Sequence, residues 1–338
     1  MKIPLSRIIP DSWKSAFCKA LPLSCGAVLM FHHIAPVNRK KIRYNDHLKV
    51  SPEYLDQTFT ALEKRGFSFV ALDELADLLE KHNLPSKVLA VTFDDGYRDN
   101  LVNGLPVLEQ HNVSGTIFVA TGLMRGEIVP WWDILEDYLL EISDGFEFEG
   151  VRYSAGSMEE KCQTFLAIRE KIMFDSDSEI RRRLIVAGIL SAEAGKKEFS
   201  RDMLTETDLK QYSDHRLISF GSHTHSHCAC GKLEPAIFAR EVQKSVEILQ
   251  SCGITVKHFA YPYGDDVNPC EDFTEILQSN QIRSAVTTYR GLLRSETSRW
   301  FLPRLFVSEY SDFPLYDDIY NAKRELIANN VKRWLHLR

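Results

Sequence analysis

Several features that would assign this chain to other classes of protein are missing from its sequence. None of the apolar runs among its 338 residues reaches the roughly 20 residues of a membrane-spanning helix. No internal repeat or low-complexity segment is present, which excludes a repeat architecture. The net charge of −6 lacks the basic excess that nucleic-acid binding calls for. What remains, 44% hydrophobic and 26% charged residues, is typical of a globular protein.

The cysteines and the two ends of the chain bear on its location. Seven irregularly spaced cysteines form no zinc-ribbon pattern, and their odd number favours reduced thiols in a cytoplasmic protein. Residues 1–24 lack the continuous apolar stretch of a secretory signal. They and residues 311–338 are instead predicted to be basic helical segments. We expect both to pack on the main domain, and peripheral contact with an anionic membrane surface is the alternative. The oligomeric state is not indicated.

The first chemical motif is a pair of adjacent carboxylates, Asp94 and Asp95, which follows an apolar run at residues 88–91. Short apolar runs bounded by turn residues indicate buried strands. In α/β folds, active sites are built at the carboxyl ends of such strands. Neighbouring carboxylates repel each other, so they require a cation or a shared proton. Taken alone, the pattern is equally consistent with an Asp-Gly turn.

A histidine cluster at residues 223–227 forms the second motif and also follows an apolar run. His223 and His227 are four residues apart, and on a helical turn this spacing directs both imidazoles to one face. Two histidines and one aspartate form the ligand set of catalytic zinc or non-haem iron, which leaves coordination positions open for water and substrate. The sequence therefore predicts a metal site.

The third motif, Tyr-Pro-Tyr-Gly at residues 261–264, closes another apolar strand. Proline and glycine favour a sharp turn that can direct the backbone N–H of Tyr263 outward. Such a donor can stabilise an oxyanion. An ordinary strand-ending turn explains this segment equally well when it is taken alone.

In order and spacing, these motifs resemble those of the polysaccharide deacetylases, the NodB-homology family of metal-dependent carbohydrate esterases. The family's Thr-Phe-Asp-Asp-Gly motif is matched at residues 92–96, its His-(Ser/Thr)-x-x-His motif at residues 223–227 and its aromatic-Pro-aromatic-Gly turn at residues 261–264. An opening strand that ends in an aromatic-His pair, residues 28–34 here, is also similar. The resemblance extends from about residue 26 to about residue 307.

The resemblance implies a role for each matched residue. Asp94 is the expected catalytic base, and Tyr263 is the expected oxyanion donor through its backbone. The expected ligands of one divalent metal ion are Asp95, His223 and His227, with zinc as the default ion and cobalt or nickel as substitutes. The implied reaction removes N-acetyl or O-acetyl groups from a glycan or glycoconjugate that contains an N-acetylhexosamine.

Two positions depart from the family pattern. The family arginine that steadies the base is replaced by Ala260, and Arg304 is our candidate substitute, although a surface arginine fits the sequence equally well. The family's late Leu-x-His motif, which supplies a general acid, has no matching copy, because residues 335–336 lack its spacing. We nominate His32 as the acid. A structural role for His32, with Asp94 returning its own proton, is the alternative.

The order of secondary-structure patterns defines the fold class. Apolar strand patterns alternate with helical ones, which indicates a parallel sheet with crossover connections. In a closed barrel the C-terminal ends of the strands converge on one face, so the three motifs would meet there. Together with the resemblance, this predicts an irregular (β/α) barrel at residues 25–310, with a mostly helical insertion at about residues 145–203 that could form a lid or a rim over the site.

Two other functions compete with deacetylation. An iron oxygenase uses the same two-His-one-carboxylate set, but such enzymes are usually all-β jelly rolls with the carboxylate close to the first histidine. A carbohydrate-binding protein that has lost catalysis would explain the missing late histidine, although it would have no need of the adjacent Asp94 and Asp95. Trp131 and Trp132 are candidates for a sugar-stacking surface, although burial in the core is the commoner role of such residues.

Overall fold

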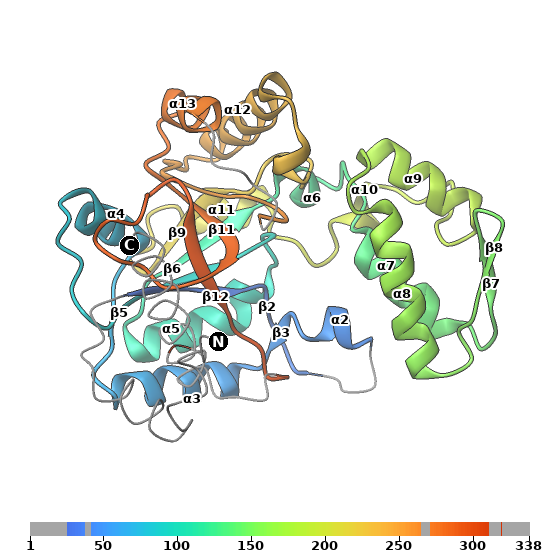
Figure 1. Cartoon of the computed structure of the whole chain (residues 1–338), viewed down its shortest axis with the longest axis horizontal. Coiled ribbons are helices and arrows are strands. Elements are labelled where there is room, and N and C mark those ends of the chain that lie inside the picture. The colour runs from blue at the N-terminus through green and yellow to red at the C-terminus, as the bar shows by residue number, and fades with distance from the viewer. Residues whose placement is uncertain (1–25, 38–41, 265–270, 311–318, 320–338) are drawn as a thin grey trace, which may run out of the picture.

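The computed structural model describes residues 26–37, 42–264, 271–310 and 319 (Figure 1). The helical segments predicted at residues 1–24 and 311–338, and the pair at residues 335–336, lie outside the described residues, apart from Ile319. Within the described part, no helix is both long enough and apolar enough to cross a bilayer.

In the described part of the chain, seven parallel strands close into a barrel. In order around the barrel they are β1 (Ala27–Phe31), β12 (Leu302–Phe306), β11 (Ser284–Arg290), β10 (His258–Ala260), β9 (Ile218–Ser222), β6 (Gly115–Val119) and β5 (Val88–Phe93). The pairing of β1 with β5 closes the barrel, and the short β4 (Ser68–Phe69) extends the sheet beside the start of β5. The predicted irregular (β/α) barrel is confirmed, and with seven strands it has one fewer than the eight-fold form.

The side chains of the strands separate into two hydrophobic clusters because they alternate between the two faces of the sheet. One row, which includes Val28, Ala90 and Phe118, fills the barrel interior, and its neighbours Leu29 and Val91 belong to the cluster beneath the outer helices. Burial on both faces is the expected state of parallel strands that are covered by helices. The same alternation extends the inward rows to the end of the barrel, where the functional side chains lie.

Helices cover the outside of the barrel, and two of them begin at a serine and a threonine cap. Ser51 accepts a hydrogen bond from the backbone N–H of Tyr54, and Thr205 forms a reciprocal capping box with Asp208. The outer helices are α3 (Pro52–Glu63), α5 (Leu105–His111), α6 (Thr121–Met124), α11 (Glu206–Tyr212), α12 (Pro235–Ser251) and α13 (Glu271–Ser279). The helix α4 (Leu72–Glu80) instead packs its buried leucines against the cluster of interior residues.

A second lobe stands beside the barrel and has its own hydrophobic core (Figure 1). Its elements are α7 (Trp131–Glu141), β7 (Phe146–Phe148), β8 (Val151–Tyr153), α8 (Met158–Ile172), α9 (Asp177–Val186) and α10 (Lys196–Phe199). The strands β7 and β8 form a hairpin that the sequence did not predict. Its loop residues Glu149 and Gly150 have φ of 54° and 74°, as a type I′ turn requires. Glu-Gly is a weaker signal for that turn than Asn-Gly or Asp-Gly.

A short segment between β1 and α3 ties the two lobes together. It contains β2 (His33–Ile34), α2 (Arg43–Asp46) and β3 (Lys49–Val50). The amide of Asn45 donates to the carbonyl of Trp132 over 3.0 Å, and the backbone N–H of Ile42 donates to Glu136 over 3.1 Å. Because both hydrogen bonds are buried, they fix the first helix of the lobe against the barrel.

The close packing of Gly221 inside the barrel yields a test of the fold. A Cβ at this position would lie 2.5 Å from the ring of Phe118 and 2.8 Å from the carbonyl oxygen of His258. Gly221→Ala should therefore lower the free energy of unfolding by about 1–3 kcal/mol, measured by urea denaturation. Gly195→Ala, where the nearest atom is 3.9 Å away, is the matched control and should change it by less than about 0.5 kcal/mol. Equal stability of the two variants would contradict this packing.

Candidate metal and catalytic centre

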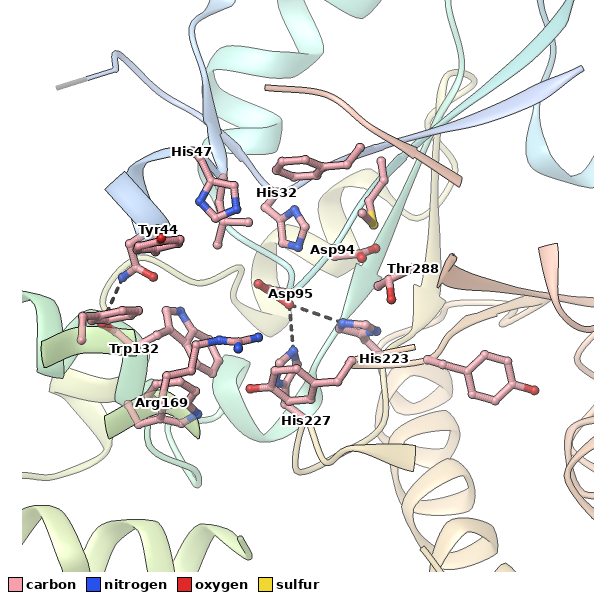
Figure 2. Close-up of a pocket in the computed structure, with 18 of the residues that line it drawn as sticks. His32, Tyr44, His47, Asp94, Asp95, Trp132, Arg169, His223, His227 and Thr288 are labelled. Atoms are coloured by element: carbon pink, nitrogen blue, oxygen red, sulfur yellow. Dashed lines mark hydrogen bonds and ion pairs between the residues drawn. The ribbon is translucent and has the colours of Figure 1, made fainter. Parts of the chain in front are cut away.

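The residues singled out in the sequence meet at one end of the barrel, where the strands end (Figure 2). In β5, Asp94 continues the inward-facing row of Ala90 and Thr92, as the alternation of a strand requires. Asp95 would then point outward, but its φ of 72° turns the chain and brings it to the same site. The structure places together here Asp94 and Asp95 after β5, His223 and His227 after β9, Tyr263 after β10, His32 after β1 and Arg304 in β12.

Asp95, His223 and His227 form a compact group that could hold a metal ion. Each offers one ligand atom, and these atoms lie within 4.8 Å of one another. Oδ1 of Asp95 is 3.4 Å from Nε2 of His223 and 3.1 Å from Nε2 of His227, as the dashed lines in Figure 2 indicate. Burial alone would raise the pKa of the Asp95 carboxyl, but the two histidines hold it well below its usual range. The carboxylate is therefore ionised and directed at both imidazoles.

The hydrogen bond made by His223 shows that this group fits a metal ion. Its Nδ1 lies 2.8 Å from the carbonyl oxygen of Ala260, which can only accept, so Nδ1 carries the proton. In a neutral imidazole, Nε2 then presents its lone pair to Asp95. With neutral rings, the positive charge that lowers the pKa of Asp95 is missing, and a metal ion between the rings and the carboxylate would supply it. Metal-binding histidines are usually oriented in this way, by a hydrogen bond from the ring nitrogen that does not bind the metal.

The two ligand histidines lie in a loop, so the helical turn expected between them is wrong. Thr224 and His227 have φ of 61° and 51°, in the left-handed region. The chain therefore folds back, and the ring centroids of His223 and His227 lie 5.1 Å apart. The loop carbonyls are also engaged elsewhere. Those of Thr224 and His225 accept hydrogen bonds from the start of α6, at 3.3 Å and 2.8 Å, instead of from a helical ladder.

Asp94 is held by a buried arginine. Nη1 and Nη2 of Arg304 donate to the two carboxylate oxygens of Asp94 over 2.7 Å and 2.6 Å. Nε donates to the carbonyl of Thr287 over 2.7 Å, and Nη1 also lies 3.1 Å from the hydroxyl of Thr92. Arg304 has no exposed surface, so the alternative of a surface arginine is wrong. Although burial favours the neutral acid, Arg304 keeps the pKa of Asp94 below its usual value.

His32 and Tyr263 lie against the same group. Burial lowers the pKa of His32 to about 4, despite the opposing charges of Asp95 and Asp94, so His32 is neutral at pH 7. Its buried Nδ1 has no hydrogen-bond partner among the described residues. Tyr263 has a φ of 50°, and its ring lies 5.1 Å from that of His227. Non-glycine residues with such φ values cost energy and cluster at functional sites.

A cavity of about 460 Å³ opens over this group and is walled by both lobes. Trp131 and Trp132 are buried, yet both line the cavity, and the ring of Trp132 is 5.0 Å from that of His227. Phe165 and Arg169 from α8 complete the wall. The sequence reasoning did not single out these two residues, because no motif marks them. Their spacing of four within a helix, which places both on one face, was the available signal.

Comparison with known proteins places the chain in a family. The family model for polysaccharide deacetylase matches residues 81–150 and 188–285. The chain belongs to the polysaccharide deacetylase family. The match is interrupted where β8, α8 and α9 of the second lobe lie. Over 93 residues, the chain is 30% identical to a protein described as a putative polysaccharide deacetylase, YxkH of Bacillus subtilis (strain 168). The matched segment makes up 27% of this chain and 30% of YxkH.

Solved structures agree on the fold. The chain is similar to the Streptococcus pyogenes deacetylase PplD, solved in complex with acetate, with a TM-score of 0.56 and 19% identity over 88% of this chain and 99% of PplD. It is also similar to IcaB from Ammonifex degensii, with a TM-score of 0.55 and 19% identity over 89% of this chain and 97% of IcaB. At 19% identity, these similarities show the fold alone.

The pairing of Arg304 with Asp94 leads to a prediction about stability and pH. Arg304→Gln leaves Asp94 buried without its cation, so the free energy of unfolding at pH 7 should fall by about 3–5 kcal/mol. A carboxyl whose pKa is lowered by folding stabilises the fold above its unfolded pKa, and this contribution is lost as the pH falls through the folded pKa. Urea denaturation should therefore show a difference between wild type and variant that shrinks below about pH 4.

The matched control for this experiment is Arg201→Gln, since the Arg201 side chain is 71% exposed and pairs only with an adjacent acid among the described residues. It should change the free energy of unfolding by less than about 0.5 kcal/mol at pH 7. An equal loss of unfolding free energy in both variants would show that the buried pair contributes no more to stability than an exposed one.

Proposed function

We propose that this protein is a metal-dependent hydrolase that removes N-acetyl (or O-acetyl) groups from a glycan or glycoconjugate containing an N-acetylhexosamine. One juxtaposition carries the proposal: Asp94, fixed by Arg304, stands beside the three clustered ligands Asp95, His223 and His227 at the base of a cavity. Membership of the polysaccharide deacetylase family supports a hydrolase that acts on carbon–nitrogen bonds other than peptide bonds.

Asp95, His223 and His227 would hold one divalent ion, with zinc as our default and cobalt or nickel as substitutes. Two imidazoles and one carboxylate satisfy three positions and leave others open, as in catalytic zinc sites. When bound, the ion would polarise the acetyl carbonyl and activate water. The hydrogen bond from Nδ1 of His223 to the carbonyl of Ala260 would keep Nε2 directed toward the ion.

Asp94 is proposed to accept the proton of the attacking water. Its lowered pKa keeps it ionised at neutral pH, and the two hydrogen bonds from Arg304 fix the orientation of the carboxylate. A general base must be held within reach of the proton it removes, and a carboxylate bound on both oxygens loses the freedom to rotate away. Arg304 is thus a positioning residue for the base.

Tyr263 and His32 are proposed to serve the later part of the reaction. The backbone N–H of Tyr263 would donate to the developing oxyanion, and one such donor typically contributes about 3 kcal/mol. The leaving amine then needs a proton. His32 is neutral at pH 7, so it can pass on a proton only after receiving one. Asp94 holds a proton once the water has attacked, and it would return that proton directly or through His32.

The competing functions receive less support. An iron oxygenase would share the ligand set, but the chain has the barrel of polysaccharide deacetylases rather than a jelly roll. A protein that only binds carbohydrate would gain nothing from Asp94, which is buried beside the ligands and bound on both oxygens. Burying such an ion pair is costly, and a requirement for a base explains its presence.

Removal of the metal tests the reaction itself. The protein loaded with zinc should release acetate from N-acetylglucosamine oligomers, measured by an enzymatic acetate assay. Treatment with a chelator should abolish the release, because the ligands alone cannot polarise the carbonyl, and added zinc, cobalt or nickel should restore it. Consumption of oxygen without release of acetate would favour the oxygenase.

Two substitutions separate the base from the ligands. Asp94→Asn should lower kcat by about 100-fold or more while the metal stays bound, because only the base is removed. His223→Ala should lose both the metal, measured by elemental analysis, and the activity. Near-normal turnover in Asp94→Asn would refute the assignment of the base. His215→Ala, which removes a histidine from the loop before β9, is the control and should keep both properties.

A further inference from the structure

We propose that Arg169 binds an anionic group, a phosphate or a carboxylate, on the sugar that occupies the cavity, so that the preferred substrate is an acidic amino sugar. The inference rests on the proposed function, because it takes the cavity over the clustered ligands as the sugar site. Arg169 would determine specificity and would have no part in the chemical step.

Arg169 lies on the cavity wall that the second lobe supplies. It is half-buried on α8, one helical turn after Phe165, whose ring stacks against Trp131 at 6.3 Å. Figure 2 shows its guanidinium reaching from the lobe toward Asp95 and His227. Its positive charge also acts on the buried hydroxyl of Tyr263, which places it close to the reaction centre.

The guanidinium of Arg169 has no acidic partner among the described residues. The cavity lining contains two carboxylates, and both are already engaged. Asp94 is bound on both oxygens by Arg304, and Asp95 faces the two ligand histidines. Three other arginines of the lobe, Arg152, Arg182 and Arg183, each form an ion pair with an acid of the same lobe, and Arg181 donates to the carbonyl of Ala194.

The charge of the cavity therefore favours an anion. Asp94 is neutralised by Arg304, a divalent ion would more than balance Asp95, and Arg169 remains as a positive charge of the lining without an acid among the described residues. The attraction is local, because the chain as a whole carries a net charge of −6. Clefts with charge of one sign concentrate ligands of the opposite sign. A planar guanidinium also matches the paired oxygens of phosphate and carboxylate groups.

A neutral sugar would not require this residue. Sugar hydroxyls can be bound by neutral groups, and the lining supplies one in Thr288, whose buried hydroxyl has no partner among the described residues. An arginine left without an acid beside such groups adds a preference for charge. The same wall supplies apolar surface through Trp131 and Phe165, on which a sugar ring can lie.

Binding calorimetry on the whole chain tests the inference with three probes: N-acetylglucosamine, N-acetylglucosamine 6-phosphate and N-acetylmuramic acid. Wild type should bind at least one of the anionic probes about 10-fold more tightly than the neutral sugar, as expected for a charge-assisted hydrogen bond. The phosphate and carboxylate arms distinguish the two sources of negative charge. The preference should weaken as the salt concentration rises.

Variants assign the preference to Arg169. Arg169→Gln should abolish it, and Arg169→Lys, which keeps the charge but not the planar fork, should retain part of it. Arg152→Gln removes the same charge from an exposed position of the same lobe, outside the cavity lining, and should keep the full preference. Circular dichroism checks that each variant is folded. If Arg169→Gln does not fold, the binding preference of Arg169→Lys is used to test the role of Arg169.

Two results would overturn the inference: equal or no binding of neutral and anionic probes by wild type, or a full preference in Arg169→Gln. Binding is measured with zinc and again in zinc-free protein, where no turnover is expected, so it is judged separately from the reaction. A failure to release acetate from any substrate would count against the proposed hydrolase and leave the binding preference standing.

Discussion

A buried guanidinium, that of Arg304, holds both carboxylate oxygens of Asp94 across the interior of the barrel. The two residues come from β12 and β5, which are separated by β1, so the pair exists only when β1 joins β5 and the sheet closes. Desolvating two charges is unfavourable, and the geometry offsets this cost because Arg304 also donates to Thr287 and Thr92. The position of Asp94 is therefore a consequence of barrel closure.

The ligand group depends on a second constraint, the conformation of the loops at the strand ends. Asp95, His227 and Tyr263 all have positive φ, and each conformation turns a side chain or a backbone N–H that strand alternation would direct elsewhere. Hydrogen bonds outside the site hold the histidine loop in place, including those from His225 and Ser226 to Glu241 on α12. The barrel thus supplies the rigid support for strained loops, which is why the three ligand atoms can lie within 4.8 Å.

The sequence predicts the barrel and the grouping of its motifs because both follow from local patterns: apolar runs end in polar residues, and parallel strands end on one face. It leaves Arg304 undecided because its environment is set by residues 210 positions away. It also misses β12, because Pro303 and Arg304 are residues that are uncommon in a buried strand. The helical turn expected between His223 and His227 fails because tertiary hydrogen bonds to α6 replace the local ladder.

The second lobe is the part of the structure that would direct the proposed reaction to a particular sugar. The residues proposed to react all lie on the barrel, and Trp131, Trp132 and Arg169 reach the cavity from the lobe. Part of the lobe falls where the family match is interrupted. Buried hydrogen bonds from Asn45 to Trp132 and from Ile42 to Glu136 fix α7 against the barrel. Opening the lobe would leave these buried groups unpaired, at about 1–3 kcal/mol each. These hydrogen bonds favour a fixed rim over a mobile lid, so the side chains of the lobe would meet the proposed substrate from set positions.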